Sequence, residues 1–446
     1  MSENRAEAPS KLKQGITGKM LYLFILGDVL GAGIYALVGE VSGAVGGAIW
    51  APLVLALAMA LLTASSYAEL ITKYPKAGGA AVFAERAFKL PIVSFMVGFA
   101  MLAAGVTSAA GLSLAFSGDY LAVFLDVPAV PAAIVFLLLV ALLNARGIKE
   151  SVRSNVVMTV IELSGLVLVI VLVALMLGRG EGYPEQVLQF REDVSPASGI
   201  LAASVIAFYS FVGFEVSANV AEEVRDVRRV YPRALFGAML TAGVVYLLIG
   251  LAAAVALPTD ELAGSSGPLL AVVQATGFGV PAELFSLVAL VAVANGALLT
   301  MIMSSRLAYG MAEQGLLPSV FGKVLPNRRT PWVAIAATTA VAIILTLTGG
   351  LAALAETVVL LLVIVFLSTN VAVLVLKKDK VEHSHFRTPV VLPLLAIATC
   401  IMLLIQQDAG IWLRAGILLA VGAVLYVIRR SVKGPGAGVR RTAAAD

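Results

Sequence analysis

Three acidic side chains stand inside long apolar runs of the chain, where ionisable residues are costly and usually functional. They are Asp28, Glu162 and Glu215, and Thr300 adds a hydroxyl in a fourth run. No lysine or arginine is expected at their level, and a buried carboxyl without a cation nearby tends to hold a proton. Carboxylates and hydroxyls also suit a hard cation such as Na⁺. The residues therefore indicate a proton or sodium site, and the alternative is that an acid merely caps free backbone amides.

The depths of these side chains can be compared through the rise of an α-helix, about 1.5 Å per residue. Asp28 lies about 12 Å from the start of its run, and Glu162 lies at a similar depth in its own. Glu215 lies about 15 Å, and Thr300 about 9 Å, from the basic residues that end their runs on the same side. The four side chains are therefore expected at one level.

Glycines interrupt two of the runs. The first contains "GDVLGAGIY", with Gly27, Gly31 and Gly33, and the second contains "FYSFVGFEVSA" around Gly213. A helix that unwinds there would leave amides for a carboxylate and carbonyls for an ammonium group. The alternative is that the spacing of Gly27 and Gly31 serves close helix packing.

The elements that must position these residues are set by composition. The chain has 446 residues, of which 60% are hydrophobic and only 13% charged, whereas soluble proteins carry about 25% charged residues. Apolar runs of about 20 residues recur throughout, each long enough for a helix to cross a ~30 Å hydrocarbon core. The sequence therefore predicts an all-α integral membrane protein with the lipid bilayer as a partner. Its twelve expected transmembrane helices are 20–45, 46–68, 92–117, 129–145, 153–177, 199–221, 234–257, 282–311, 332–349, 354–376, 389–406 and 409–428.

The two glycine-broken runs each open a block of five spans. Because five is odd, the second block must enter the membrane inverted relative to the first, and broken helices at matching positions of inverted halves are typical of a transporter binding site. The predicted segments are a tail 1–19, a first repeat 20–177, an external loop 178–198, a second repeat 199–376, two further helices 377–432, and a tail 433–446.

Basic residues predict the orientation. Of 31 Lys and Arg residues, only Arg179, Arg191 and Arg414 fall on one side of the expected spans, and that side is predicted to be external. Both tails are then cytoplasmic, in a multi-pass protein of the cell (plasma) membrane. No cleaved signal peptide is expected. Glu69, at the cytoplasmic end of its run, is expected at the membrane interface.

Other functions are disfavoured by the same sequence. The basic residues are dispersed through short loops without a nucleic-acid-binding motif, so no nucleic acid is expected as a partner. The single cysteine, Cys400, excludes an internal disulfide. His383 and His385 lie in a polar loop, where a solvated pair is expected and metal binding is the alternative. No nucleophile–base or metal constellation occurs at the shared depth, so neither an enzyme nor a cofactor is expected.

Five segments resemble the amino acid–polyamine–organocation superfamily of secondary transporters over nearly the whole chain. "GDVLGAGIY" is similar to the family's break in helix 1, and "LGAGIYALVGEV" resembles the cationic amino acid transporter branch. The other four segments are "SSYAELITKYPKAGGAAVFAERAF" (65–88), "NARGIKESVRSNVVMTVIEL" (144–163), "FYSFVGFEVSANVAEEVRDVRRVYPRA" (208–234) and "SSRLAYGMAEQGLLPSVFGKVLPNRRTPW" (304–332).

The resemblance implies a LeuT-like fold with a five-plus-five inverted repeat, discontinuous helices 1 and 6, and alternating access. Tyr209 falls where many relatives place an aromatic gate, and Glu215 falls at a position that relatives use in substrate binding or gating. The implied substrate-binding backbone comprises Gly31, Ala32, Gly33 and Ile34 in helix 1 and Phe211, Val212 and Gly213 in helix 6.

One departure from the family concerns ion coupling. Many relatives carry a lysine at Glu162, which bridges the helix 1 break and a small hydroxyl residue matching Thr300, and relatives usually have an uncharged residue at Asp28. We therefore expect protonated Glu162 or Asp28 to replace that lysine. The alternative is that these acids attract a cationic substrate.

The sequence thus predicts a secondary transporter that imports an amino acid or related amine together with protons. The alternatives are an amino acid or polyamine exchanger, a sodium-coupled carrier and, less favoured, a channel or a nutrient sensor. The sequence leaves open whether the protein is a monomer or a homodimer.

Overall fold

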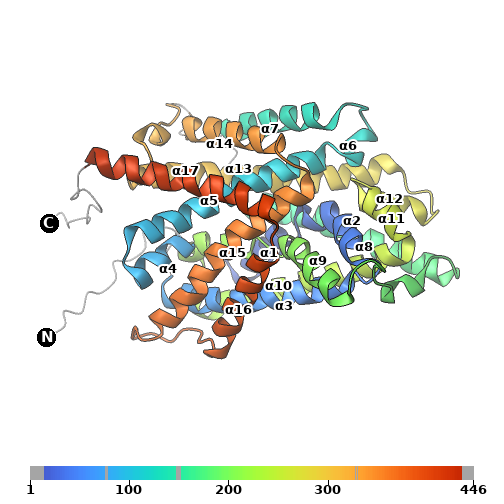
Figure 1. The fold of residues 1–446 in the computed structure, drawn as a ribbon, viewed down its shortest axis with the longest axis horizontal. Coiled ribbons are helices and arrows are strands. Elements are labelled where there is room, and N and C mark those ends of the chain that lie inside the picture. The colour runs from blue at the N-terminus through green and yellow to red at the C-terminus, as the bar shows by residue number, and fades with distance from the viewer. Residues whose placement is uncertain (1–14, 76–78, 147–151, 327, 329, 434–446) are drawn as a thin grey trace.

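The structure is a computed structural model that describes residues 15–75, 79–146, 152–326, 328 and 330–433, so the predicted tails lie largely outside it. Within this described part the chain is helical and forms no β-strand, only two isolated β-bridges. Figure 1 shows one helical bundle, with α7 and α14 along one edge and α16 near the opposite edge. The all-α prediction is confirmed.

Eight helices of the described residues are long and apolar enough to cross a bilayer. A bent pair, α1 (Gly18–Leu30) and α2 (Ala32–Val45), makes a ninth if it is counted as one span. Three shorter apolar helices lie on three further predicted runs, so every predicted run contains a helix. The eight are α3 (Trp50–Lys73), α5 (Pro91–Phe116), α8 (Val152–Gly178), α9 (Pro196–Ser210) with the 3₁₀ helix η2 (Phe214–Glu223), α10 (Val227–Ala256), α13 (Ala282–Glu313), α15 (Leu351–Leu376) and α17 (Ala409–Lys433). The shorter three are α7 (Ala129–Ala145), α14 (Trp332–Thr346) and α16 (Val391–Ile405).

Short helices between the spans were not predicted. At the expected external side, the Asp119 carboxylate in the first of these helices accepts hydrogen bonds from the amides of Ser266 and Gly267, at 2.9 and 3.0 Å. These bonds tie α6 to the segment between α11 and α12. The short elements are α4 (Gly79–Phe88), α6 (Asp119–Ala122), α11 (Thr259–Gly264), α12 (Pro268–Ala275), η1 (Pro184–Leu188) and η3 (Ser319–Gly322).

The two broken helices run antiparallel, side by side. Before the start of α1, Ile16 forms a β-bridge with Val224, which follows the end of η2. At the other end, a Cβ added to Gly199 in the first turn of α9 would lie 3.8 Å from the Cα of Val45, the last residue of α2. The middle of one broken helix therefore faces the middle of the other.

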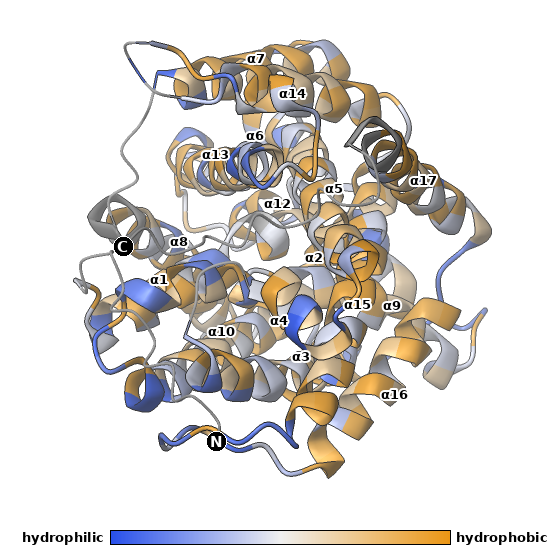
Figure 2. Cartoon of the chain, turned by 90° about the vertical axis from the view of Figure 1, so that its left-hand side faces the viewer, coloured by the Kyte–Doolittle hydropathy of each residue, from blue (hydrophilic) through white to orange (hydrophobic). Residues whose placement is uncertain are grey.

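Apolar side chains cover the outside of the bundle. Figure 2 shows hydrophobic ribbon on the outer helices as well as inside. A contiguous exposed apolar surface of this kind is not stable in water and fits contact with lipid. Exposed members on the outer helices α7, α8, α14 and α17 include Val135, Leu138, Val167, Val171, Ile344, Leu413, Ile417 and Val421.

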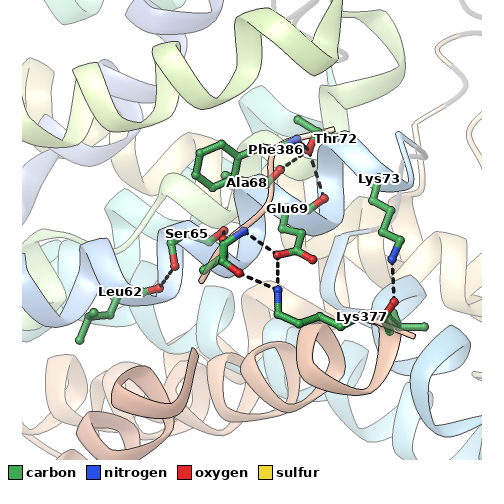
Figure 3. Close-up of polar contacts among 10 residues, drawn as sticks. Leu62, Ser65, Ala68, Glu69, Thr72, Lys73, Lys377 and Phe386 are labelled. Carbon is green, nitrogen blue, oxygen red and sulfur yellow. Dashed lines mark hydrogen bonds and ion pairs between the residues drawn. The ribbon is translucent and has the colours of Figure 1, made fainter. Parts of the chain in front are cut away.

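A loop after α15 packs against the end of α3, as Figure 3 shows. The Glu69 side chain is only 3% exposed, and its carboxylate lies 2.8 Å from the Lys377 ammonium. The same carboxylate accepts a hydrogen bond from the Thr388 amide at 2.8 Å. We call residues 377–389 the strap. Glu69 is thus buried and paired, which holds the strap on α3.

The histidine pair belongs to this strap. His383 lies with Nε2 3.2 Å from the Lys73 carbonyl, and partial burial lowers the pKa of His385. The loop is therefore packed on the bundle instead of fully solvated as expected. Among the described residues, no group of three or more His, Cys, Asp or Glu side chains could hold a metal.

Candidate functional site

A cavity of about 380 Å³ lies where the two broken helices meet α5, α13 and α15. Its lining on α5 includes Met101, Gly105, Ser108 and Leu112, and such i, i+4, i+7 and i+11 positions share one face of a helix. The breaks supply its other side, and the exposed residue Arg306 lines one end. That end is the one predicted to face the cytoplasm.

The first break brings backbone to the cavity wall. Helix α1 ends at Leu30 and α2 begins at Ala32, with a bend of 41° across the break. Gly31 and Gly33 both line the cavity. The Tyr246 hydroxyl donates to the Val29 carbonyl at 2.5 Å, which satisfies a group at the end of the interrupted helix.

The second break is formed around Gly213. Its φ of +125° lies in a region that favours glycine, and a Cβ there would lie 2.7 Å from the Asp28 carbonyl oxygen. The Glu215 carboxylate accepts a hydrogen bond from the Gly213 amide at 2.9 Å. Glu215 therefore performs the amide-capping role that the sequence left as an alternative, and it also lines the cavity.

Hydroxyl groups line the cavity from three helices. Tyr209 on α9 and Ser108 on α5 share a hydrogen bond of 2.8 Å. The pair joins the broken helix to α5. Thr300 on α13 donates to the Gly296 and Ala297 carbonyls of its own helix, at 3.0 Å each.

Glu162 lies outside the cavity lining and is fully buried. Its Oε1 accepts a hydrogen bond from Asn295 Nδ2 on α13 at 3.3 Å, and its Oε2 has no partner among the described residues. The Tyr35 hydroxyl on α2 donates to the Glu162 carbonyl at 2.6 Å. The carboxyl is therefore placed behind the first break, between α8, α2 and α13.

Eight of the twelve predicted site residues line this cavity. Phe211 and Ile34 are buried beside the breaks, Ala32 begins α2 with its side chain outside the described part, and Glu162 lies behind. The eight are Asp28, Gly31, Gly33, Tyr209, Val212, Gly213, Glu215 and Thr300.

Several polar residues of the site were not predicted. Ser108, Tyr246 and Asn295 stand in apolar runs, and Asn295 was detectable as an uncharged polar residue near the middle of its run. Arg306 was treated only as the end of a span, yet it lines the same cavity as Asp28. A basic side chain therefore lies at one end of this cavity, which was not expected from the sequence.

This arrangement can bind a small zwitterion or amine. The backbone of the two broken helices provides amides and carbonyls at the cavity wall. Carboxyl groups lie on both broken helices, and the cavity provides space beside them.

Comparisons with known proteins agree with this geometry. Residues 16–423 match the amino acid permease family. The branched-chain amino acid permease BcaP of Bacillus subtilis is 24% identical, over 94% of this chain and 93% of its own. The methylthioribose transporter of the same organism is 26% identical, over 95% of each chain. A vacuolar cationic amino acid transporter 4 of Arabidopsis thaliana is 28% identical, over 83% of this chain and 64% of its own.

The family and these relatives are transporters and not enzymes. The match spans the broken helices, the cavity and the strap. With its apolar spans, the chain is a multi-pass membrane protein, and it belongs to the amino acid permease family of the amino acid–polyamine–organocation superfamily.

Proposed function

We propose that this protein carries an amino acid or a related amine across the plasma membrane by alternating access. The observation that carries the proposal is the meeting of two antiparallel broken helices at one cavity, where Gly213 approaches the Asp28 carbonyl. The backbone of Gly31, Ala32, Gly33 and Ile34 and of Phe211, Val212 and Gly213 is the proposed substrate cradle. Tyr209 closes the cradle on its external side.

The proposed architecture has twelve spans, counted by adding the bent pair and the three shorter apolar helices to the eight long ones. Two inverted repeats, 20–177 and 199–376, would place the broken helices antiparallel, and the observed bridge of Ile16 with Val224 supports this. Both tails are cytoplasmic in this proposal. Arg306, an exposed residue, lines the end of the cavity that this proposal places toward the cytoplasm.

The proposed coupling ion is the proton, with Glu162 as its carrier. One oxygen of this fully buried carboxyl has no partner among the described residues, and no lysine or arginine is among its hydrogen-bond partners. A proton on that oxygen would remove the cost of an uncompensated buried charge. Asp28, in the cavity wall, is a second candidate. Na⁺ would need several oxygen ligands around the Glu162 carboxylate, whereas Asn295 turns its amide nitrogen toward Oε1.

The relatives support the solute class. Their names include a branched-chain amino acid and cationic amino acids, and also methylthioribose. A substrate with a carboxylate and an ammonium group fits the amides and carbonyls at the breaks. We therefore propose an amino acid as the principal substrate.

Uptake into proteoliposomes tests this proposal. Purified protein is reconstituted and supplied with labelled amino acids and amines, under an imposed pH gradient or an imposed sodium gradient. We expect uptake of an amino acid that an inward proton gradient accelerates. Uptake that follows sodium and ignores pH would refute proton coupling, and no uptake of any panel member would refute the transport proposal.

The variant Glu162→Gln tests the site of coupling. Glutamine keeps the shape and the bond to Asn295 but cannot gain or lose a proton, so uptake should persist in exchange mode and lose its acceleration by the pH gradient. Glu283→Gln, at an exposed acid in the first turn of α13, is the matched control and should keep the gradient response. An unchanged pH response in Glu162→Gln would exclude this carboxyl as the proton carrier.

A further inference from the structure

We infer that the substrate is a neutral amino acid with an unbranched or branched apolar side chain, and that a wall formed by α5, α13 and α15 selects it. This inference rests on the proposed transport of an amino acid and narrows its substrate class. The wall residues are Met101, Leu112, Leu299, Met303, Val358 and Leu362.

The wall and the helix breaks occupy different elements around the cavity. Both acidic side chains of the lining belong to the broken helices, Asp28 to α1 and Glu215 to η2. Glu215 also accepts the Gly213 amide, which holds its carboxylate at the break. A substrate docked with its ammonium and carboxylate at the breaks therefore directs its side chain away from both acids, toward the wall.

The wall offers nothing that compensates a second positive charge. A buried ammonium or guanidinium group needs a carboxylate or an aromatic face, and the six wall residues supply only aliphatic and thioether groups. A lysine side chain would therefore lose hydration without gaining a partner.

Two polar side chains interspersed with the wall already make hydrogen bonds. Thr300 donates to carbonyls of its own helix, and Ser108 is bonded to Tyr209. The six wall residues form an apolar surface with two methionines, whose flexible thioethers adapt to side chains of different shape. The cavity therefore suits leucine, isoleucine, methionine and norleucine together.

Norleucine and lysine provide the decisive comparison, because they share a carbon skeleton and differ by the terminal ammonium group. Labelled leucine and labelled lysine are offered in separate uptake assays with the reconstituted wild-type protein, and unlabelled norleucine and lysine compete against whichever is taken up. We expect leucine uptake, with norleucine competing at least about 100-fold better than lysine. Lysine competing equally well or better would overturn the inference and leave amino acid transport intact. Absence of uptake of every amino acid would overturn the proposed function itself.

A pair of methionine variants tests the wall directly. Met303→Ala removes apolar contact and should weaken leucine competition by about 10-fold or more, while leaving weak lysine competition unchanged. Met402→Ala, on α16 and outside the cavity lining, is the control and should change neither. Thermal unfolding in detergent verifies that both variants are folded. Unchanged leucine competition in folded Met303→Ala would overturn the assignment of the wall.

Discussion

Replacing Gly213 by alanine should disable transport by separating the two helix breaks. The φ of Gly213 is +125°, a conformation that L-residues rarely adopt. The added Cβ would lie 2.7 Å from the Asp28 carbonyl oxygen and 3.0 Å from its carbonyl carbon. Both atoms belong to backbone, so no side-chain rotation can relieve the contact.

The size of the displacement follows from these distances. Ordinary van der Waals contacts begin at 3.4 Å, so α1 and η2 must move apart by 0.7 Å at this point. The unfavourable backbone conformation adds about 1–3 kcal/mol of strain. A displacement near 1 Å in a preorganised site costs about 100-fold in rate. We therefore expect the transport rate to fall between about 10-fold and 100-fold. The same backbone strain should also lower the thermal stability of the folded protein.

The assay is initial uptake into proteoliposomes, normalised to the amount of protein reconstituted. Gly310→Ala is the matched control because it lies on the cavity-lining helix α13 and a Cβ there meets nothing within 4 Å. That alanine should leave uptake within about twofold and stabilise the helix by about 1 kcal/mol. Wild-type uptake by Gly213→Ala would show that the two breaks need not touch for transport, and would refute this reasoning.

Two further predictions concern the strap and the gate. Lys377→Met should lower the free energy of unfolding by about 3–5 kcal/mol, because it leaves the buried Glu69 carboxylate unpaired; Glu69→Gln should cost only about 1–3 kcal/mol, since the ammonium it leaves is partly exposed. Thermal and denaturant unfolding in detergent measure these losses of stability. The double variant should recover part of the loss caused by Lys377→Met. Equal losses in the two single variants would contradict the expected difference between them. Tyr209→Phe removes the hydroxyl bonded to Ser108 and should reduce uptake by about 3-fold to 10-fold through about 0.5–1.5 kcal/mol, with unchanged thermal unfolding. A stability loss without a transport defect would assign this bond to folding instead of gating.

Much of the fold could be predicted because span length and glycine pattern are local properties. A bilayer requires about 20 apolar residues per helix whatever the tertiary contacts, and every predicted run contains a helix. The breaks at Gly31 and Gly213 lie where the glycines indicated them. The short helices α4, α11 and α12 have no such period, and their positions depend on neighbours far along the chain.

The sequence brought several site residues together but could not say which way each side chain faces. The rise per residue predicted a common level for Asp28, Glu215 and Thr300, and all three line one cavity. The same arithmetic placed Glu162 with them, but the side of a helix that a residue faces depends on how the helix packs. Glu69 shows the same limit, because its partner Lys377 follows 308 residues later in the chain.

The position of Glu162 bears on how an ion and a substrate could be coupled. Tyr35 on α2 donates its hydroxyl to the backbone carbonyl of Glu162 on α8. Gly33, two residues earlier on α2, lines the cavity. A proton at Glu162 and a substrate at Gly33 would therefore act on one short segment from opposite sides. Coupling requires only that both occupants favour the same position of that segment. A coupling carboxyl behind the break can thus bias α2 without competing with the substrate for space in the cavity.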